Sequence, residues 1–128
     1  MNINTIKEFW IKSAAEDLKT AESLFTSKRY HHCLFFCHLF IEKLLKALVV
    51  KNTKEPSPYG HNLLSFAKLS GIKFSQEQLD YLAEITAFNI EGRYDDYKFS
   101  FYKKATRKYA VHYLEQSRKF YLWLKKQL

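Results

Sequence analysis

Glycine and proline are scarce in this sequence, with only 3 glycines and 2 prolines among 128 residues. Folds rich in β-sheet need more of these turn-forming residues, so the composition disfavours them. The 2 cysteines, Cys33 and Cys37, are four residues apart in an apolar run, which favours reduced core residues over a disulfide. No run approaches the roughly 18 apolar residues of a membrane span, and polar residues 1–8 do not resemble a signal peptide. We therefore expect a cytoplasmic protein without membrane contact.

Apolar residues recur at helical spacing along most of the chain, and 47% of the residues are hydrophobic. The pattern predicts helices over residues 4–27, 29–51, 61–69, 75–89 and 100–126. Loops are expected around Pro56 and Pro58 and over residues 89–99. The second helix is apolar around most of its circumference, so it should lie at the centre of the fold. We therefore predict a single all-α domain over residues 1–128, an up-down bundle of four to five helices.

Positive charge is concentrated at the C-terminal end of the chain. The whole sequence has a formal net charge of +8, from 21 Lys and Arg and 13 Asp and Glu. Residues 93–128 contain 10 of those bases and 3 of the acids, a net charge of +7. The first 92 residues therefore carry 11 bases and 10 acids, a net charge of +1. This asymmetry indicates an anionic partner such as a nucleotide or nucleic acid, although a solvated lysine-rich helix would give the same count.

Four stretches, in order along nearly the whole chain, resemble the HEPN domain, a bacterial and archaeal helical module. Residues 15–22 (AEDLKTAE) resemble its first helix, and residues 40–48 (FIEKLLKAL) resemble the A-x-E-K-x-L-K-A-L of its second. GHNL at 60–63 resembles the T-H-D-L that opens the third helix, and EGRYDD at 91–96 resembles the E-A-R-Y-P-D loop before the last. The resemblance implies a HEPN-like fold with a polar site near the N-terminus of the last helix.

The same resemblance implies partners and an activity. HEPN domains commonly form homodimers, and many are encoded beside a nucleotidyltransferase as a toxin–antitoxin pair. The catalytic members are metal-independent ribonucleases with an Arg followed, after four to six residues, by a His. Here Arg93 is followed at those positions by Lys98, Phe99 and Ser100. Because such a ribonuclease needs an imidazole for proton transfer, the departure favours binding over cleavage and leaves enzymatic activity undecided.

Arg93 is the leading candidate for ligand binding, since its guanidinium offers a planar set of donors to phosphate. The alternative is a structural ion pair with Asp95, Asp96 or Glu42. Neighbouring tyrosines could stack on a base, and the resemblance implies that a tyrosine near this motif can be nucleotidylated by the partner enzyme, with ordinary packing as the alternative. The predicted nucleotide- or RNA-binding set is Arg93, Tyr94, Asp96, Tyr97, Lys43 and Lys98.

Two further functions stay open. In a metal-independent ribonuclease toxin, His61 or Lys98 would replace the missing histidine beside Arg93. A non-catalytic scaffold would instead dock another protein on an apolar face. We expect no cofactor and no metal site, because the cluster His31, His32, Cys33, Cys37 and His38 lies on one continuous helix and cannot surround a zinc ion. His38 is predicted to be a core or interface residue, and His112 is predicted to pack on the core stripe of the last helix.

Overall fold

Helices account for all the regular structure in the computed structural model, which describes residues 2–128. They are α1 (Ile3–Thr26), α2 (Tyr30–Thr53), α3 (Leu63–Ser70), α4 (Gln76–Thr86), α5 (Phe88–Arg93), α6 (Ser100–Lys104) and α7 (Arg107–Lys126). The predicted all-α class is therefore confirmed. None of the helices within residues 2–128 combines the length and the apolar character needed to cross a membrane.

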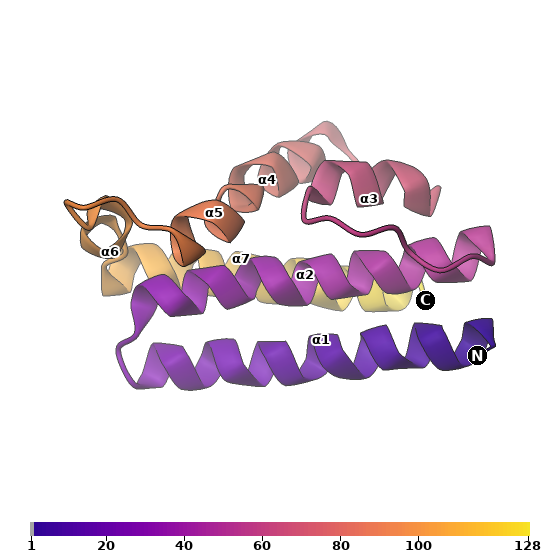
Figure 1. Ribbon diagram of the computed structural model, residues 1–128, viewed down its shortest axis with the longest axis horizontal. Coiled ribbons are helices and arrows are strands. Elements are labelled where there is room, and N and C mark those ends of the chain that lie inside the picture. The colour runs from indigo at the N-terminus through magenta and orange to yellow at the C-terminus, as the bar shows by residue number, and fades with distance from the viewer. Residues whose placement is uncertain (1) are drawn as a thin grey trace.

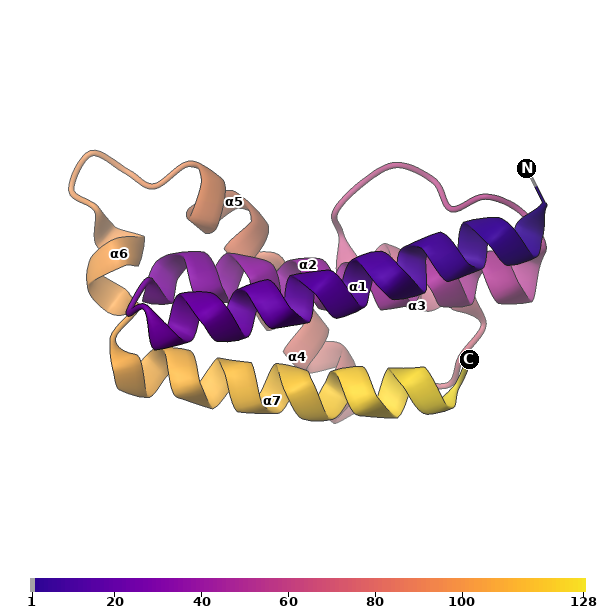
Figure 2. The ribbon, with the colours of Figure 1, turned by 90° about the horizontal axis from the view of Figure 1, so that it is seen from below.

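The three long helices lie side by side, with α1 running opposite to both α2 and α7 (Figures 1 and 2). The short helices α3, α4 and α5 carry the chain back along another face of α2, so that α7 can start at the same end of the bundle as α2 (Figure 1). The result is the predicted up-down bundle, in which the third antiparallel segment consists of the three short helices α3, α4 and α5. This return path matters because it brings the α5–α6 connection to the beginning of α2.

The centre of the bundle is α2, as its apolar circumference predicted. Fourteen of its 24 residues are buried, and it packs against α1, α7, α3 and α5. Phe40, Ile41 and Leu44 are completely inaccessible to solvent. Burying each such side chain contributes roughly 1.5–3 kcal/mol, so α2 is held from several sides and offers a rigid support for anything placed at its ends.

Local signals mark the helix ends where the sequence placed them. Ser75 accepts a hydrogen bond from the Gln78 backbone N–H, and the Gln78 side chain accepts one from the Ser75 N–H, which makes a capping box at the start of α4. Gly71 ends α3 in the left-handed conformation, with φ of 72°. The cap of α1 is Asn2, whose side chain accepts a hydrogen bond from the Thr5 N–H.

Three expectations about the last third of the chain are wrong. Residues 89–93 belong to α5 instead of a loop, because the buried ring of Phe88 packs against Phe101 and Tyr113 and anchors this short helix. The final helix is split in two, since the Thr106 side chain accepts from the Tyr109 N–H and starts α7 afresh. His112 is exposed on α7 and does not belong to the core.

Candidate functional site

A hollow of about 500 Å³ lies where the start of α2 meets the end of α5 and the chain leading into α6. Its lining residues are His31, His32, Gly92, Arg93, Asp95, Phe99, Tyr102 and Lys103. Arg93 ends α5 and is exposed to solvent. Within the described part of the chain, Arg93 takes part in no salt bridge. Its guanidinium is therefore free to meet an anion from solution.

The close packing of α5 on α2 positions Arg93. Gly92 approaches α2 so closely that a Cβ atom added there would lie 2.7 Å from the Cβ of Phe35. The guanidinium carbon of Arg93 is 5.1 Å from the centre of the Phe35 ring, in a cation–π contact. The glycine thus allows the approach, and the aromatic ring supports one face of the guanidinium at the wall of the hollow.

Two carboxylates shape the connection between α5 and α6. Asp95 accepts from the backbone N–H groups of Phe101 (3.0 Å) and Tyr102 (2.9 Å), and Asp96 accepts from those of Lys98 and Ser100 (3.0 Å each). Desolvation pushes the pKa of Asp95 upward, but these backbone donors outweigh it and hold the pKa below its usual value. Hydrogen bonds from Ser100 chiefly lower the pKa of Asp96. Both carboxylates are therefore charged at neutral pH, and their oxygens accept hydrogen bonds from the backbone of the loop and of α6.

The loop also carries backbone strain beside the hollow. Phe99 has φ of 55°, in the left-handed region that bulky side chains rarely adopt. Its ring is nevertheless 60% exposed, so burial of the ring does not explain the conformation. The Asp96 hydrogen bonds to residues on either side of Phe99 hold this turn in place.

Two histidines line the same hollow as Arg93. His31 and His32 belong to the first turn of α2, and their ring centroids are 3.9 Å apart. His31 is half-buried and packs edge-on against Tyr102 of α6, with ring centroids 5.0 Å apart. Burial chiefly lowers the pKa of His31, and the charge of His32 lowers it further, while Asp95 opposes both effects. The sequence singles out these residues only as a zinc cluster that one helix cannot form, and their position at the start of that helix is the one local signal that links them to the loop.

The other predicted binding residues are distributed over two surfaces. Tyr94 and Tyr97 are 73% and 86% exposed, and the Lys98 ammonium lies 5.7 Å from the centre of the Tyr97 ring. These three stand on the same loop as Arg93. Lys43 does not join them, because its ammonium is 2.6 Å from the Asp17 carboxylate in a contact between α2 and α1.

A separate polar cluster accounts for Glu42 and His61. The buried Glu42 carboxylate lies 2.8 Å from Nδ1 of His61 and 3.2 Å from the ammonium of Lys46. His38 is fully buried beside it and reaches the backbone oxygen of His61 at 2.9 Å, and burial lowers the pKa of His38. The suggested pairing of Glu42 with Arg93 is therefore wrong. His61 does not line the Arg93 hollow, since its partly exposed ring is paired with the buried Glu42 carboxylate.

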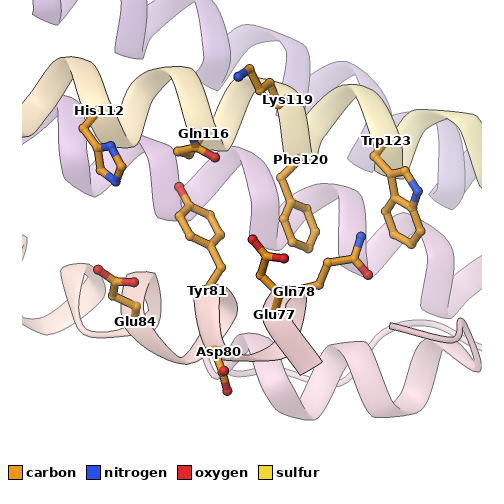
Figure 3. A pocket seen from close by; sticks show the side chains of 10 residues that line it. All are labelled: Glu77, Gln78, Asp80, Tyr81, Glu84, His112, Gln116, Lys119, Phe120 and Trp123. Carbon is orange, nitrogen blue, oxygen red and sulfur yellow. The ribbon is translucent and has the colours of Figure 1, made fainter. Parts of the chain in front are cut away.

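A second hollow, of about 610 Å³, lies between α4 and α7 (Figure 3). Tyr81 and Glu77 point from α4 toward α7, where Phe120 and Trp123 form an aromatic wall (Figure 3). Glu84 and Asp80 add further negative charge to the α4 side. Although it is larger than the Arg93 hollow, this groove has carboxylates where a phosphate would need donors, so it does not fit the anionic ligand that the charge distribution indicates.

Metal binding finds no support in the described residues. Between residues 2 and 128, no group of three or more His, Cys, Asp or Glu side chains is arranged to hold a metal ion. Apart from Asp95, whose oxygens accept backbone hydrogen bonds, the side chains that line the Arg93 hollow are basic, imidazole or aromatic groups, a set that suits phosphate and bases.

Comparison with known proteins agrees with this architecture. The family model described as the HEPN domain matches residues 7–127. This chain belongs to the HEPN domain family. A search of curated proteins found no match. Among solved structures, TT1696 from Thermus thermophilus superposes on this HEPN domain with a TM-score of 0.84 at 19% identity, covering 100% of both chains. ST0689, an archaeal HEPN homologue, gives a TM-score of 0.76 at 22% identity, covering 94% of this chain and 96% of its own. At these identities the similarity establishes the shared fold.

Proposed function

We propose that this HEPN domain binds RNA or a nucleotide through phosphate contacts in the hollow around Arg93. The observation that carries the proposal is an exposed guanidinium with no carboxylate partner among the described residues. Lys103 lines the same hollow, and Lys98 stands on the adjoining loop. Three positive groups around a recess attract phosphate and make its binding strongly dependent on salt.

Exposed aromatic rings favour a single-stranded RNA over an isolated phosphate. Among residues 2–128, five of the ten exposed large hydrophobic side chains fall within residues 90–102, namely Ile90, Tyr94, Tyr97, Phe99 and Tyr102. Four of these five are aromatic, and a base stacked on such a ring gains roughly 1–3 kcal/mol. Basic groups that contact phosphates next to rings that stack on bases are the usual combination in proteins that bind single strands.

The proposal is tested by measuring binding of a short labelled RNA, ATP and GTP to wild-type protein and to Arg93→Ala. Losing one charge-assisted contact should cost about 1.5–3 kcal/mol, which is roughly a tenfold to 150-fold weaker affinity. The slope of log affinity against log salt should also fall by about one. The matched control is Lys126→Ala, which also removes one positive charge but lies at the C-terminal end of α7, outside the Arg93 hollow. Equal losses in both variants would mean that overall charge, and not this hollow, attracts the ligand.

We further propose that the domain works as a homodimer with a nucleotidyltransferase partner, in a toxin–antitoxin arrangement. The family resemblance supports this role, and the highly exposed rings of Tyr94 and Tyr97 keep two hydroxyls accessible for nucleotidylation. The test is purification from the native source with molar-mass measurement and peptide mass spectrometry. A dimer carrying a nucleotide on the peptide of Tyr94 and Tyr97 would support the proposal, and an unmodified monomer would contradict it. Copurification of a partner without any RNA or nucleotide binding would favour the scaffold alternative.

A further inference from the structure

We propose that Phe99 stacks on a nucleobase of the bound ligand, so that the hollow selects nucleotides and unpaired RNA over other phosphate compounds. This inference deepens the proposed function and rests on phosphate binding by Arg93 at the same hollow. A guanidinium supplies charge to any phosphate, and phosphate contacts by themselves carry no information about the base. Selection of nucleotides therefore needs a second group that contacts the base itself.

The hollow has the lining that a flat, mostly apolar ring system requires. Four of its eight lining residues carry rings, namely His31, His32, Phe99 and Tyr102. Most of the exposed surface of the hollow is apolar, even though Arg93 stands at its wall. Its volume of about 500 Å³ falls in the range of about 300–1,000 Å³ that is usual for small-molecule sites. Phosphate alone would use the guanidinium and leave this apolar wall without a ligand group to cover it.

Nothing in the local backbone favours phenylalanine at position 99. Its φ of 55° and ψ of 43° lie in the left-handed region, which glycine adopts freely and a bulky side chain adopts only at a cost. Phe99 is also the cap residue of α6, where short polar residues are preferred, and its side chain makes no capping hydrogen bond. Because the ring is 60% exposed, the core gains little from it. Strain at an exposed ring beside a hollow indicates a side chain that serves a ligand and not the fold.

Asp95 and Asp96 provide the capping that position 99 does not. The backbone N–H groups of the first three residues of α6 have no partner within the helix, and they donate to these two carboxylates at 2.9–3.0 Å. Asp96 also accepts from the N–H of Lys98, so its hydrogen bonds hold the backbone on both sides of Phe99. Because neighbouring residues maintain the turn, a substitution of the Phe99 ring should leave the loop folded.

The base that stacks on Phe99 has to be unpaired. In a duplex each base is stacked on its neighbours, whereas the bases of single-stranded RNA and of free nucleotides are available to aromatic side chains. A phosphate held by Arg93 would lie at the wall of the same hollow that the Phe99 ring lines. One nucleotide can therefore use both contacts, the guanidinium for its phosphate and the ring for its base.

The experiment measures the affinity of the protein for a short single-stranded RNA and for an abasic oligomer of the same length, which carries the same phosphates without bases. Phe99→Leu, which removes the ring, should bind the RNA roughly fivefold to 150-fold more weakly than wild type and bind the abasic oligomer equally well. Phe99→Tyr keeps a ring and should bind the RNA as wild type does. The matched control is Phe9→Leu, because the Phe9 ring is 58% exposed on α1 and lies outside the hollow. It should change neither affinity.

Urea denaturation separates this role from a structural one. Phe99→Gly removes the ring together with the cost of the left-handed conformation, whereas Phe99→Leu keeps that cost. Phe99→Gly should therefore lose RNA affinity as Phe99→Leu does, yet unfold at a urea concentration no lower than that of Phe99→Leu. If both variants unfold at clearly lower urea concentrations than wild type and bind both oligomers more weakly, the ring supports the fold and the inference is overturned.

The outcomes distinguish this inference from the proposed function. RNA that binds through Arg93 with the same affinity in wild type and in Phe99→Leu overturns the stacking inference and leaves the binding proposal standing. An equal loss of affinity for the RNA and for the abasic oligomer in Phe99→Leu also overturns it, since the ring would then act without a base. Absence of RNA binding, or full affinity in Arg93→Ala, overturns both proposals.

Discussion

Replacing Glu42 with leucine should destabilise this HEPN domain more than any single surface substitution. The Glu42 carboxylate is only 3% exposed, and it is the partner of the Lys46 ammonium at 3.2 Å and of the His61 ring at 2.8 Å. Lys46 is itself 7% exposed, with its ammonium 4.8 Å from the centre of the Trp10 ring and 5.2 Å from that of Phe66. The substitution would leave this cation buried among aromatic rings without its carboxylate.

The expected magnitude follows from the burial of both partners. Breaking a buried ion pair by removing one member costs about 3–5 kcal/mol, because the remaining charge stays desolvated. Domains of this kind unfold with a total free energy of about 5–15 kcal/mol. The variant should therefore lose a large fraction of its stability, and its midpoint of thermal unfolding should fall by roughly 10–20 °C.

The assay is urea denaturation followed by far-UV circular dichroism at neutral pH. Glu42→Leu combined with Lys46→Met should recover most of the loss, since an apolar pair of similar volume replaces the ion pair without leaving a buried charge. The control is Asp17→Asn, which breaks the more accessible pair between Lys43 and Asp17 and should cost less. A loss below about 1 kcal/mol in Glu42→Leu, or no recovery in the double variant, would refute the reasoning.

Two further predictions concern the packing and the loop of the Arg93 hollow. In Gly92→Ala, the new Cβ would clash with the Cβ of Phe35 at 2.7 Å, so α5 must shift. Overpacking of this kind lowers the free energy of unfolding by about 1–3 kcal/mol, and the higher helix propensity of alanine offsets about 1 kcal/mol of that loss. RNA affinity should therefore fall more clearly than stability, and unchanged affinity in fluorescence anisotropy would contradict this. Asp95 has a lowered pKa, so its stabilisation of the loop is present at neutral pH and lost as the pH falls from its usual value of 3.8 through the lowered one. The protection factors of the Phe101 and Tyr102 amides against hydrogen exchange, taken relative to the intrinsic rate at each pH, should fall over that range in the wild type and be low already at pH 7 in Asp95→Asn.

Helix positions could be predicted well where the signals are local. The periodicity of α1 and α2, the prolines that follow α2 and the Ser75 capping box all act within a few residues, so they can be read directly along the chain. The break at Ala105–Thr106 was missed because apolar residues continue on both sides of it, and the Thr106 cap is a common residue in helices as well. The prediction for His112 is wrong because the buried face of α7 carries Ala110, Leu114 and Ser117, and His112 lies outside it.

The sequence by itself determined that this chain is a helical HEPN domain with a basic C-terminal third, and it singled out Arg93 through its motif. Only the tertiary structure decided which side chains stand around that arginine: His31 and His32 join it, whereas Glu42, His61 and Lys43 are bound elsewhere. The physical reason is the separation along the chain between the residues that must come into contact. Helix formation depends on contacts three or four residues apart, but the composition of the hollow depends on how α5, α6 and the start of α2 pack after the chain has returned through α3 and α4.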